Sequence, residues 1–430
     1  MAEIASYDDA VAWLDDHIGA GVKPGLERIT GLLELLARPD ESYPIVHVAG
    51  TNGKTSTARM TAGLIGAHGL ATGLFTSPHL QAVEERYEHG MRPMSREAFA
   101  VAVAELAPVV DLWSESSGDR ITYFEITAAL AFAWFAEKAV DAAVIEVGLG
   151  GRWDATNAAT SEVAVVTSIG LEHTAYLGDT EALIAAEKAA ILDRDAVLVT
   201  GELSDEALAV IRARAEEQGA LWHRFGPDFG PDDARPAVGG WLFDVEGIHA
   251  RYTGIDLRLH GAHQVHNFTV GVAATEALFG RALDLGAVRE AAARASTPGR
   301  MEIVRRDPLV MLDGAHNPPG MAALAEALGQ EFPTSRWALV FGVMRDKDAA
   351  SMLSHLDGLV TTAHVARAAG SDRALPAGEA AALVHGALDV ETVEHPSVAD
   401  AVAAAISSGD PVLVTGSLYV VGEARTALGV

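Results

Sequence analysis

The sequence predicts an α/β protein in which two mostly parallel sheets are each covered by helices. Short runs rich in Val and Ile alternate with stretches rich in Ala, Leu, Glu and Arg that have helical spacing. The Val/Ile runs are continuous, which is typical of parallel strands buried on both faces. A second series of such runs begins after Pro298-Gly299-Arg300. We therefore expect two domains, residues 1–298 and 299–430.

The expected strands of the first domain end in Gly, Glu, Ser or Thr, where a parallel sheet presents its ligand-binding edge. They are residues 45–49, 142–147, 163–168 and 196–200, with helices such as 55–68 and 180–191 between them. Residues 222–259 are rich in Gly, Pro, Asp and aromatic residues, and they predict a small β-rich excursion. The expected strands of the second domain are 309–312, 338–341, 358–365 and 411–415.

The composition narrows the class of protein. Its 430 residues are 49% apolar, enough for a sizeable core, and 31 Lys and Arg against 59 Asp and Glu give a net charge of −28. Such a surface repels phosphate backbones, so we expect no nucleic-acid partner. The absence of Cys excludes disulfides and a thiol nucleophile. The acidic N-terminus, without a long apolar run, predicts no signal peptide and no membrane partner, and therefore a cytoplasmic protein.

A glycine-containing segment between the first strand and its helix predicts a phosphate-binding loop, Gly50-Thr51-Asn52-Gly53-Lys54-Thr55. Glycines let backbone N–H groups turn toward phosphates, Lys54 adds a cation, and the helix N-terminus adds its dipole. Thr55 could place a hydroxyl on Mg²⁺. The match to the general motif is partial, because Val48 stands where its first glycine would be. The alternative is an ordinary glycine turn.

Polar residues follow two further strands of the first domain. Glu146 ends an apolar strand, as a Mg²⁺-holding carboxylate does in nucleoside triphosphatases, although an acid in a loop is the alternative. His173 follows the next strand, and by itself such a histidine more often has a purely structural role than that of a ligand. Lys188 lies beside Glu187 on an expected helix, ordinarily the setting of a solvated charge.

Two other polar clusters could suggest binding sites, the first for a metal ion and the second for a nucleotide. His260, His263 and His266 are spaced by three residues, which suits neither a strand face nor a helical histidine pair, so we expect no zinc site. Asp313-Gly314-Ala315-His316-Asn317-Pro318 stands between a strand and a helix of the second domain. It could reach a nucleotide, or it could simply cap the helix.

Taken together, these segments resemble the folylpolyglutamate synthase and dihydrofolate synthase family of Mur-type ATP-dependent ligases. The resemblance runs from about Gly25 nearly to the end of the chain. Its landmarks in order are Gly25–Ile29, Val48–Thr55, Thr76–Leu80, Thr122–Glu125, Glu146–Asn157, Thr167–Ile169 with His173, Glu187–Ala189, His263-Gln264 with Asn267, Pro298–Arg300, Asp313–Pro318, Asp346–Asp348 and Thr415–Ser417. The family's fold implies a P-loop Mur-ligase-like central domain with the β excursion, and a Rossmann-like C-terminal α/β domain.

The resemblance also implies roles for individual residues. ATP would be bound by Gly50, Thr51, Asn52, Gly53, Lys54, Thr55, Asn267, Arg300 and Asp313, and two Mg²⁺ ions by Ser77, Glu146, His173 and Lys188. In relatives the lysine matched by Lys188 is typically carbamylated. Catalytic roles would fall to Lys54, Lys188, Arg300 and His316. The pterin pocket would be lined by Gly25, Leu26, Glu27, Arg28, Thr122, Tyr123, Phe124, Gly151, Arg152 and Trp153.

The implied reaction joins L-glutamate to dihydropteroate or to a folate through an acyl phosphate made with ATP, in a monomer whose partners are small molecules. Whether one acceptor or both is used stays open.

Three departures from the family pattern bear on the site, namely Thr55, the segment Val83–Tyr87 and Trp153. Three other functions compete with this interpretation. They are a cell-wall Mur ligase, for which too few residues precede Lys54, a P-loop ATPase without ligase activity, and a non-catalytic nucleotide-binding protein.

Overall fold

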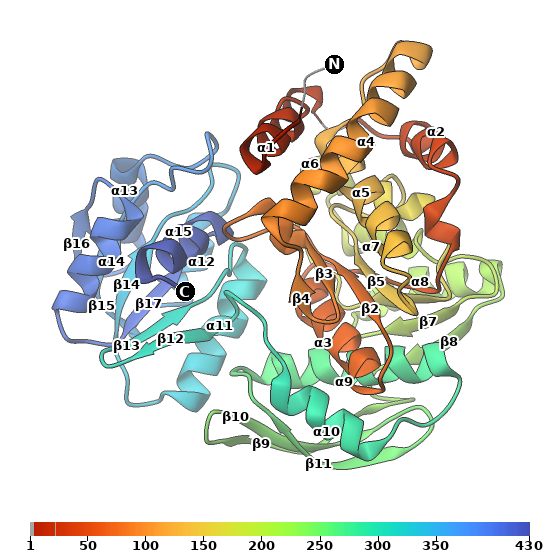
Figure 1. Cartoon of the computed structure of the whole chain (residues 1–430). Coiled ribbons are helices and arrows are strands. Elements are labelled where there is room, and N and C mark those ends of the chain that lie inside the picture. The colour runs from red at the N-terminus through yellow and green to blue at the C-terminus, as the bar shows by residue number, and fades with distance from the viewer. Residues whose placement is uncertain (1–3, 22) are drawn as a thin grey trace. The chain divides into compact units, whose positions relative to one another are not determined.

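The computed structural model describes residues 4–21 and 23–430, and it divides the chain into two compact units (Figure 1). The first unit contains the chain up to Ala234, together with Phe243–Asp256 and His266–Ala295. The second contains Arg235–Leu242, Leu257–Val265 and Ser296–Val430. In the part of the chain described, no helix is long and apolar enough to cross a membrane.

The first unit is built on an eight-stranded sheet in the order β4-β3-β2-β5-β1-β6-β7-β8. The strands are β1 (Ile45–Ala49), β2 (Thr72–Phe75), β3 (Tyr87–His89), β4 (Arg92–Pro93), β5 (Ala142–Glu146), β6 (Val163–Val166), β7 (Val197–Thr200) and β8 (Leu221–Arg224). The pairs from β2 to β8 are parallel, whereas β3 and β4 are antiparallel at one edge. The central strand β1 therefore aims the following loop at the carboxyl edge of the sheet, where ligands bind.

Helices cover both faces of this sheet because its strands carry apolar side chains on both faces. One core contains residues of α1 (Tyr7–Asp15), α2 (Glu27–Leu35), α4 (Arg96–Ser117) and α5 (Tyr123–Glu137), and the opposite core contains residues of α3 (Lys54–Ala67) and α9 (Ala262–Phe279). Helices α7 (Glu181–Ala189) and α8 (Asp205–Gln218) pack beside β6 and β7, and α10 (Leu285–Arg294) packs on α3. The short helix α6 (Thr174–Leu177) precedes α7.

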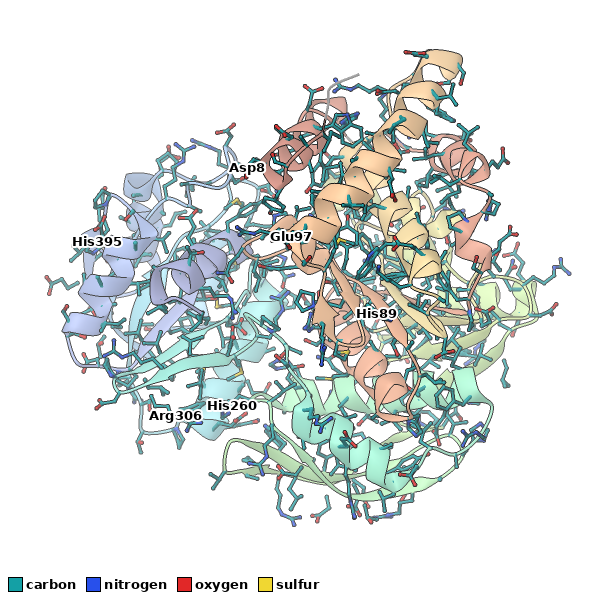
Figure 2. The ribbon with its side chains drawn as sticks, viewed as in Figure 1. Asp8, His89, Glu97, His260, Arg306 and His395 are labelled. Carbon is teal, nitrogen blue, oxygen red and sulfur yellow. The ribbon has the colours of Figure 1, made fainter. Side chains whose placement is uncertain are left out.

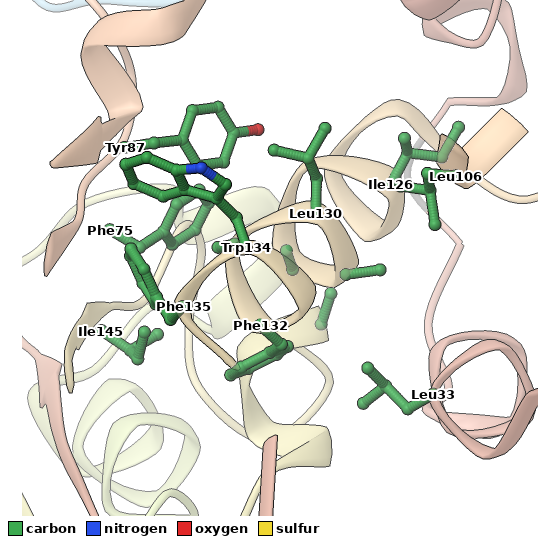
Figure 3. Close-up of a cluster of buried hydrophobic side chains, with 14 of the residues drawn as sticks. Leu33, Phe75, Tyr87, Leu106, Ile126, Leu130, Phe132, Trp134, Phe135 and Ile145 are labelled. Carbon is green, nitrogen blue, oxygen red and sulfur yellow. The ribbon is translucent and has the colours of Figure 1, made fainter. Parts of the chain in front are cut away.

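The first core is centred on α5, as Figure 3 shows. This helix is apolar on nearly every side, so it is buried between the sheet and the neighbouring helices α2 and α4. Phe132 and Phe135 are fully buried in it, and truncation of such a side chain to Ala costs about 3–5 kcal/mol. This packing holds the central strands in place, and the carboxyl edge of the sheet with them.

A small three-stranded sheet has the order β11-β10-β9. Its strands are β9 (Gly230–Ala237), β10 (Gly240–Glu246) and β11 (Arg251–Leu257), which confirms the predicted β-rich excursion. The excursion begins later than predicted, because residues 222–224 form the end of β8 in the large sheet.

The second unit contains a six-stranded sheet in the order β12-β13-β17-β14-β15-β16. Its strands are β12 (Glu302–Arg306), β13 (Leu309–Leu312), β14 (Trp337–Phe341), β15 (Val360–Val365), β16 (Glu391–Glu394) and β17 (Val412–Thr415), and only β12 pairs antiparallel. The core on one face includes α11 (Pro318–Glu331), α12 (Ala349–Ser354) and α13 (Ala377–Ala387), and α14 (Val398–Ser407) and α15 (Leu418–Leu428) complete the unit. The predicted parallel strands of both halves are thus confirmed.

Candidate active site

The loop after β1 has a shape that only glycine allows at two positions. Gly50 has φ +150° and Gly53 has φ +83°. A Cβ on Gly50 would lie 1.9 Å from Oγ1 of Thr167, and one on Gly53 would lie 2.5 Å from Oδ1 of Asn267. The Thr57 hydroxyl also donates to Asn267 Oδ1 at 3.5 Å. Asn267 of α9 therefore lies directly against the loop.

The segment that follows β6 holds this loop in position. The backbone N–H of Thr51 donates to the Ser168 carbonyl at 2.8 Å, and that of Asn52 donates to the Ser168 hydroxyl at 2.9 Å. The Thr167 hydroxyl donates to the Asn52 carbonyl at 2.7 Å. Thr167 and Ser168 were not among the predicted site residues, although hydroxyl residues ending a buried strand are a signal that could have identified them. Their hydrogen bonds hold the loop in one shape.

Two lysines converge on the same loop. Lys54 Nζ donates to the carbonyls of Gly50 at 3.0 Å and Thr51 at 3.1 Å. Lys188 Nζ, in a residue only 4% exposed, donates to the Gly50 carbonyl at 2.8 Å. Burial and, to a smaller extent, the neighbouring charge of Lys54 lower the pKa of Lys188 to about 7. Lys188 is therefore not the solvated surface charge that its sequence context suggested.

Glu146 joins two other elements at the carboxyl edge of the sheet. It is 1% exposed, and its two carboxylate oxygens accept from the Thr55 hydroxyl at 2.7 Å and the Ser77 backbone N–H at 3.0 Å. Carboxylate and hydroxyl oxygens are the donors that Mg²⁺ prefers. In residues 4–21 and 23–430, no three or more His, Cys, Asp and Glu side chains form a group that could hold a metal ion. The donor set at Glu146 therefore fits a hard cation completed by hydroxyls and waters.

His173 lies after β6 at this edge of the sheet. It has φ +51° and precedes α6, and its side chain is 35% exposed with Nε2 4.0 Å from Oε1 of Glu172. The Glu172 side chain is only 9% exposed, and its negative charge acts on Lys188. Glu172 is a third residue that the sequence patterns did not identify, because a single acid in a loop carries no distinctive signal.

The residues predicted to line the pterin pocket fall into two groups. In the first, Arg28 Nε pairs with the Glu125 carboxylate at 2.9 Å and Nη2 donates to the Lys23 carbonyl at 2.6 Å. Thr122 caps α5, with its hydroxyl accepting from the Glu125 N–H at 3.3 Å. Gly25, with φ +117°, Leu26 and Glu27 form the entry into α2. These contacts give Arg28 and Thr122 structural roles in the helical layer.

The second group surrounds the loop after β5. A Cβ on Gly148 would lie 2.4 Å from the Phe124 ring, so Phe124 packs on this loop. Arg152 pairs with Glu187 at 2.9 Å, and Gly151 lies against the α7 backbone beside Lys188. Trp153 is 52% exposed. Tyr123 lies 5.6 Å from the Arg86 guanidinium, so a cation adjoins this residue of the predicted pocket.

In the second unit, three predicted residues form one turn after β13. The Asp313 carboxylate accepts from the N–H groups of Met301 at 2.9 Å and Ala315 at 2.8 Å. His316 Nδ1 lies 2.8 Å from the Gly314 carbonyl, and a Cβ on Gly314 would lie 2.4 Å from Arg300 Nη1. Asn317 caps α11, because its side-chain Oδ1 accepts from the Gly320 backbone N–H at 2.8 Å. The hydrogen bonds of this segment therefore agree with the interpretation as a helix cap, and Arg300 lies against the segment at Gly314.

The three spaced histidines have separate surroundings. His260 Nδ1 lies 2.6 Å from Oε2 of Glu331, and the His266 ring lies 5.0 Å from that of Phe225. His263 lies against Gly261, whose Cβ would be 2.3 Å from its ring.

Family models match both halves of the chain. The description "Mur ligase middle domain" matches residues 48–275, and "Mur ligase, glutamate ligase domain" matches residues 299–418. The phosphate loop and Glu146 lie in the first match, and Arg300 to Asn317 lie in the second. The fold and the site thus define a Mur-type ATP-dependent ligase.

Whole-chain relatives narrow this class. A dihydrofolate synthase/folylpolyglutamate synthase of Mycobacterium tuberculosis is 39% identical over 95% of this chain and 91% of its own, and that of Bacillus subtilis is 35% identical over 98% and 99%. The structure of Mycobacterium tuberculosis folylpolyglutamate synthase complexed with ADP superposes with a TM-score of 0.94 at 38% identity, covering 100% of this chain and 99% of that one. The chain belongs to the dihydrofolate synthase/folylpolyglutamate synthase family. The resemblance inferred from its landmarks is confirmed.

Proposed function

We propose that this chain uses ATP to add L-glutamate to dihydropteroate, to a folate, or to both. The observation that carries the proposal is the closely packed loop of Gly50 and Gly53, with Lys54 and Glu146 beside it, in a chain of which 95% matches one of these synthases. A solved relative is described as an FPGS–AMPPCP–folate complex, and it superposes with a TM-score of 0.82 at 29% identity.

The chemistry requires an activated carboxylate. The acceptor carboxylate attacks the γ-phosphorus of ATP, so that ADP leaves and an acyl phosphate forms. The glutamate amine then attacks the acyl carbon, phosphate leaves, and the amine loses a proton. No protein nucleophile is needed, which agrees with the absence of Cys. The protein positions the reactants and stabilises negative charge, for which Lys54 and Arg300 are the proposed cations and His316 a further catalytic group.

Magnesium is the proposed cofactor alongside ATP. Glu146, Ser77 and His173 would hold it with the Thr55 hydroxyl nearby, and the bound ion would offset phosphate charge. A second ion would use a carbamylated Lys188, because a carbamate converts the cation into an oxygen ligand. The lowered pKa of Lys188 supports this, since only the neutral amine reacts with CO₂. With ¹³C-labelled CO₂, the wild-type protein should show a carbamate resonance that Lys188→Met lacks.

The remaining assignments follow from the same resemblance. We propose that Gly50–Thr55, Asn267 and Asp313 contact ATP, and that Phe124 with the loop carrying Gly151 to Trp153 forms the acceptor pocket. Residues 1–298 and 299–430 stay the predicted domains. A monomeric state and a cytoplasmic location also stay predictions.

The decisive assay supplies ATP, Mg²⁺ and L-glutamate with dihydropteroate in one reaction and a reduced folate in another. Mass spectrometry should show one added glutamyl group on at least one acceptor. Addition to both identifies a bifunctional synthase, and addition to one identifies the branch. ATP hydrolysis with neither product would contradict the proposal and favour a P-loop ATPase or a ligase for another acceptor.

A further inference from the structure

One carboxylate of the second unit binds the beginning of α9. Glu331 is the last residue of α11, and its side chain is 5% exposed. Its Oε1 accepts from the Gly261 backbone N–H at 2.5 Å and from the Trp241 indole N–H at 2.9 Å, and its Oε2 lies 2.6 Å from Nδ1 of His260. Gly261 directly precedes the first residue of α9. His260 beside α11 is labelled in Figure 2.

This contact is a helix cap supplied from outside the helix. The first N–H groups of a helix lack intrahelical acceptors, and a negative charge there also interacts favourably with the helix dipole. Gly261 has φ +95°, and a Cβ on it would meet the His263 ring at 2.3 Å, so no side chain at this position could serve as a local cap. The buried Glu331 carboxylate therefore acts as the cap of α9.

The helix that Glu331 caps is the one that contacts the phosphate loop. Asn267, in the second turn of α9, lies against Gly53 and Thr57. One turn further along α9, Gly271 packs closely on α3. A Cβ on Gly271 would lie 3.3 Å from Oγ1 and 3.4 Å from the backbone N of Thr61. A shift at the start of α9 would therefore move Asn267 and change the shape of the loop.

We propose that Glu331 is a positioning residue for nucleotide binding, acting through α9 and Asn267. This inference rests on the proposed ATP-binding function. It also gives α11 a role at both ends, since the helix begins directly after the turn of Asp313 and His316 and ends at the cap of α9.

The test measures ADP affinity by isothermal titration calorimetry on the full chain. Glu331→Ala should weaken ADP binding about tenfold, the effect of losing one charge-assisted hydrogen bond. Glu331→Gln should retain most of the affinity, because its oxygen still accepts from Gly261 and Trp241 and its amide can donate to His260. The matched control is Glu326→Ala on the exposed face of the same helix, where the carboxylate bonds only Gln330 at 3.0 Å, and it should bind ADP as the wild type does.

The outcomes separate this inference from the function on which it rests. If the wild-type protein does not bind ADP, the proposed function itself fails. If folded Glu331→Ala binds ADP as tightly as wild type, the positioning role is overturned. Should Glu331→Ala not fold, the Trp241 indole N–H resonance of the wild-type protein, assigned with Trp241→Phe, provides the measurement. It should shift when ADP binds, and an unmoved resonance would equally overturn the proposal.

Discussion

Several ionisable side chains of the first unit are buried, and each has a specific partner. His47 on β1 is 1% exposed, and its Nε2 lies 2.8 Å from the Thr156 hydroxyl. That hydroxyl donates to the buried Asp154 at 2.5 Å, and Asp154 also accepts from the Leu149 N–H at 2.8 Å. Burial raises the pKa of Asp154. This chain of polar contacts ties the central strand to the loop that carries the predicted acceptor residues.

Replacement of Lys54 or Glu146 tests the site most directly. Lys54→Ala should abolish turnover, and Glu146→Ala should do so even at high Mg²⁺, because no neighbouring group can replace the lost charge. Removal of comparable electrostatic groups lowers kcat by about 10²–10³. The exposed Lys138→Ala, which loses a pair with Glu137 and a contact with the Trp134 ring, is the matched control. Near wild-type kcat in either site variant would show that the site lies elsewhere.

His47 predicts a pH dependence of stability. Burial lowers its pKa from 6.5 to about 3, so the unfolded chain takes up a proton in this window and the folded chain does not. The free energy of unfolding should therefore fall as pH drops below about 6.5, by up to about 1.4 kcal/mol per pH unit. Urea denaturation of His47→Gln against wild type between pH 7 and 5.5 measures this contribution. Equal slopes for the two proteins would refute it.

At the scale of whole elements, continuous apolar runs were sufficient to predict the parallel strands. Residues 309–312 coincide with β13, and 45–49 coincide with β1. The limits of the excursion were harder to predict, because no residue of β8 is fully buried and its sequence lacks the continuous apolar run of the other parallel strands. Contacts such as Ser168 to Asn52 and Glu331 to Gly261 could not be predicted, since they join segments distant in sequence through side chains without a recognisable pattern.

The two ends of α3 allow a matched comparison of two glycines, Gly53 before the helix and Gly69 after it. Gly53 and Gly69 both have φ +83°, but a Cβ on Gly53 would meet Asn267 at 2.5 Å, while nothing lies within 4 Å of one on Gly69. Both Ala variants should lose about 1–2 kcal/mol of stability to backbone strain. Only Gly53→Ala should also lose nucleotide affinity, because the loop and Asn267 must move apart. Calorimetric titration with ADP checks this, and loss of affinity in both variants would point to strain alone.

For the whole molecule, the dominant feature is a net charge of −28. Like charges repel one another in the folded chain, and salt screens this repulsion, with a Debye length of about 8 Å at physiological ionic strength. The melting temperature should therefore rise between low and physiological NaCl concentration. Differential scanning fluorimetry measures it, with sucrose at equal osmolarity as an uncharged control. A melting temperature that is independent of salt would show that the acidic residues lie too far apart to destabilise the fold.

The second unit takes two of its three segments from the middle of the sequence, Arg235–Leu242 and Leu257–Val265. During synthesis on the ribosome, these segments emerge well before α11 and its Glu331 exist. Trp241 and Gly261 must then wait for their acceptor, and the start of α9 cannot be capped until the chain has passed residue 331. A cut at the sequence boundary near 299 would therefore separate partners, and fragment 1–298 should be less stable to protease than the same residues in the full chain. Nascent-chain proteolysis should show protection of α9 appearing late in translation.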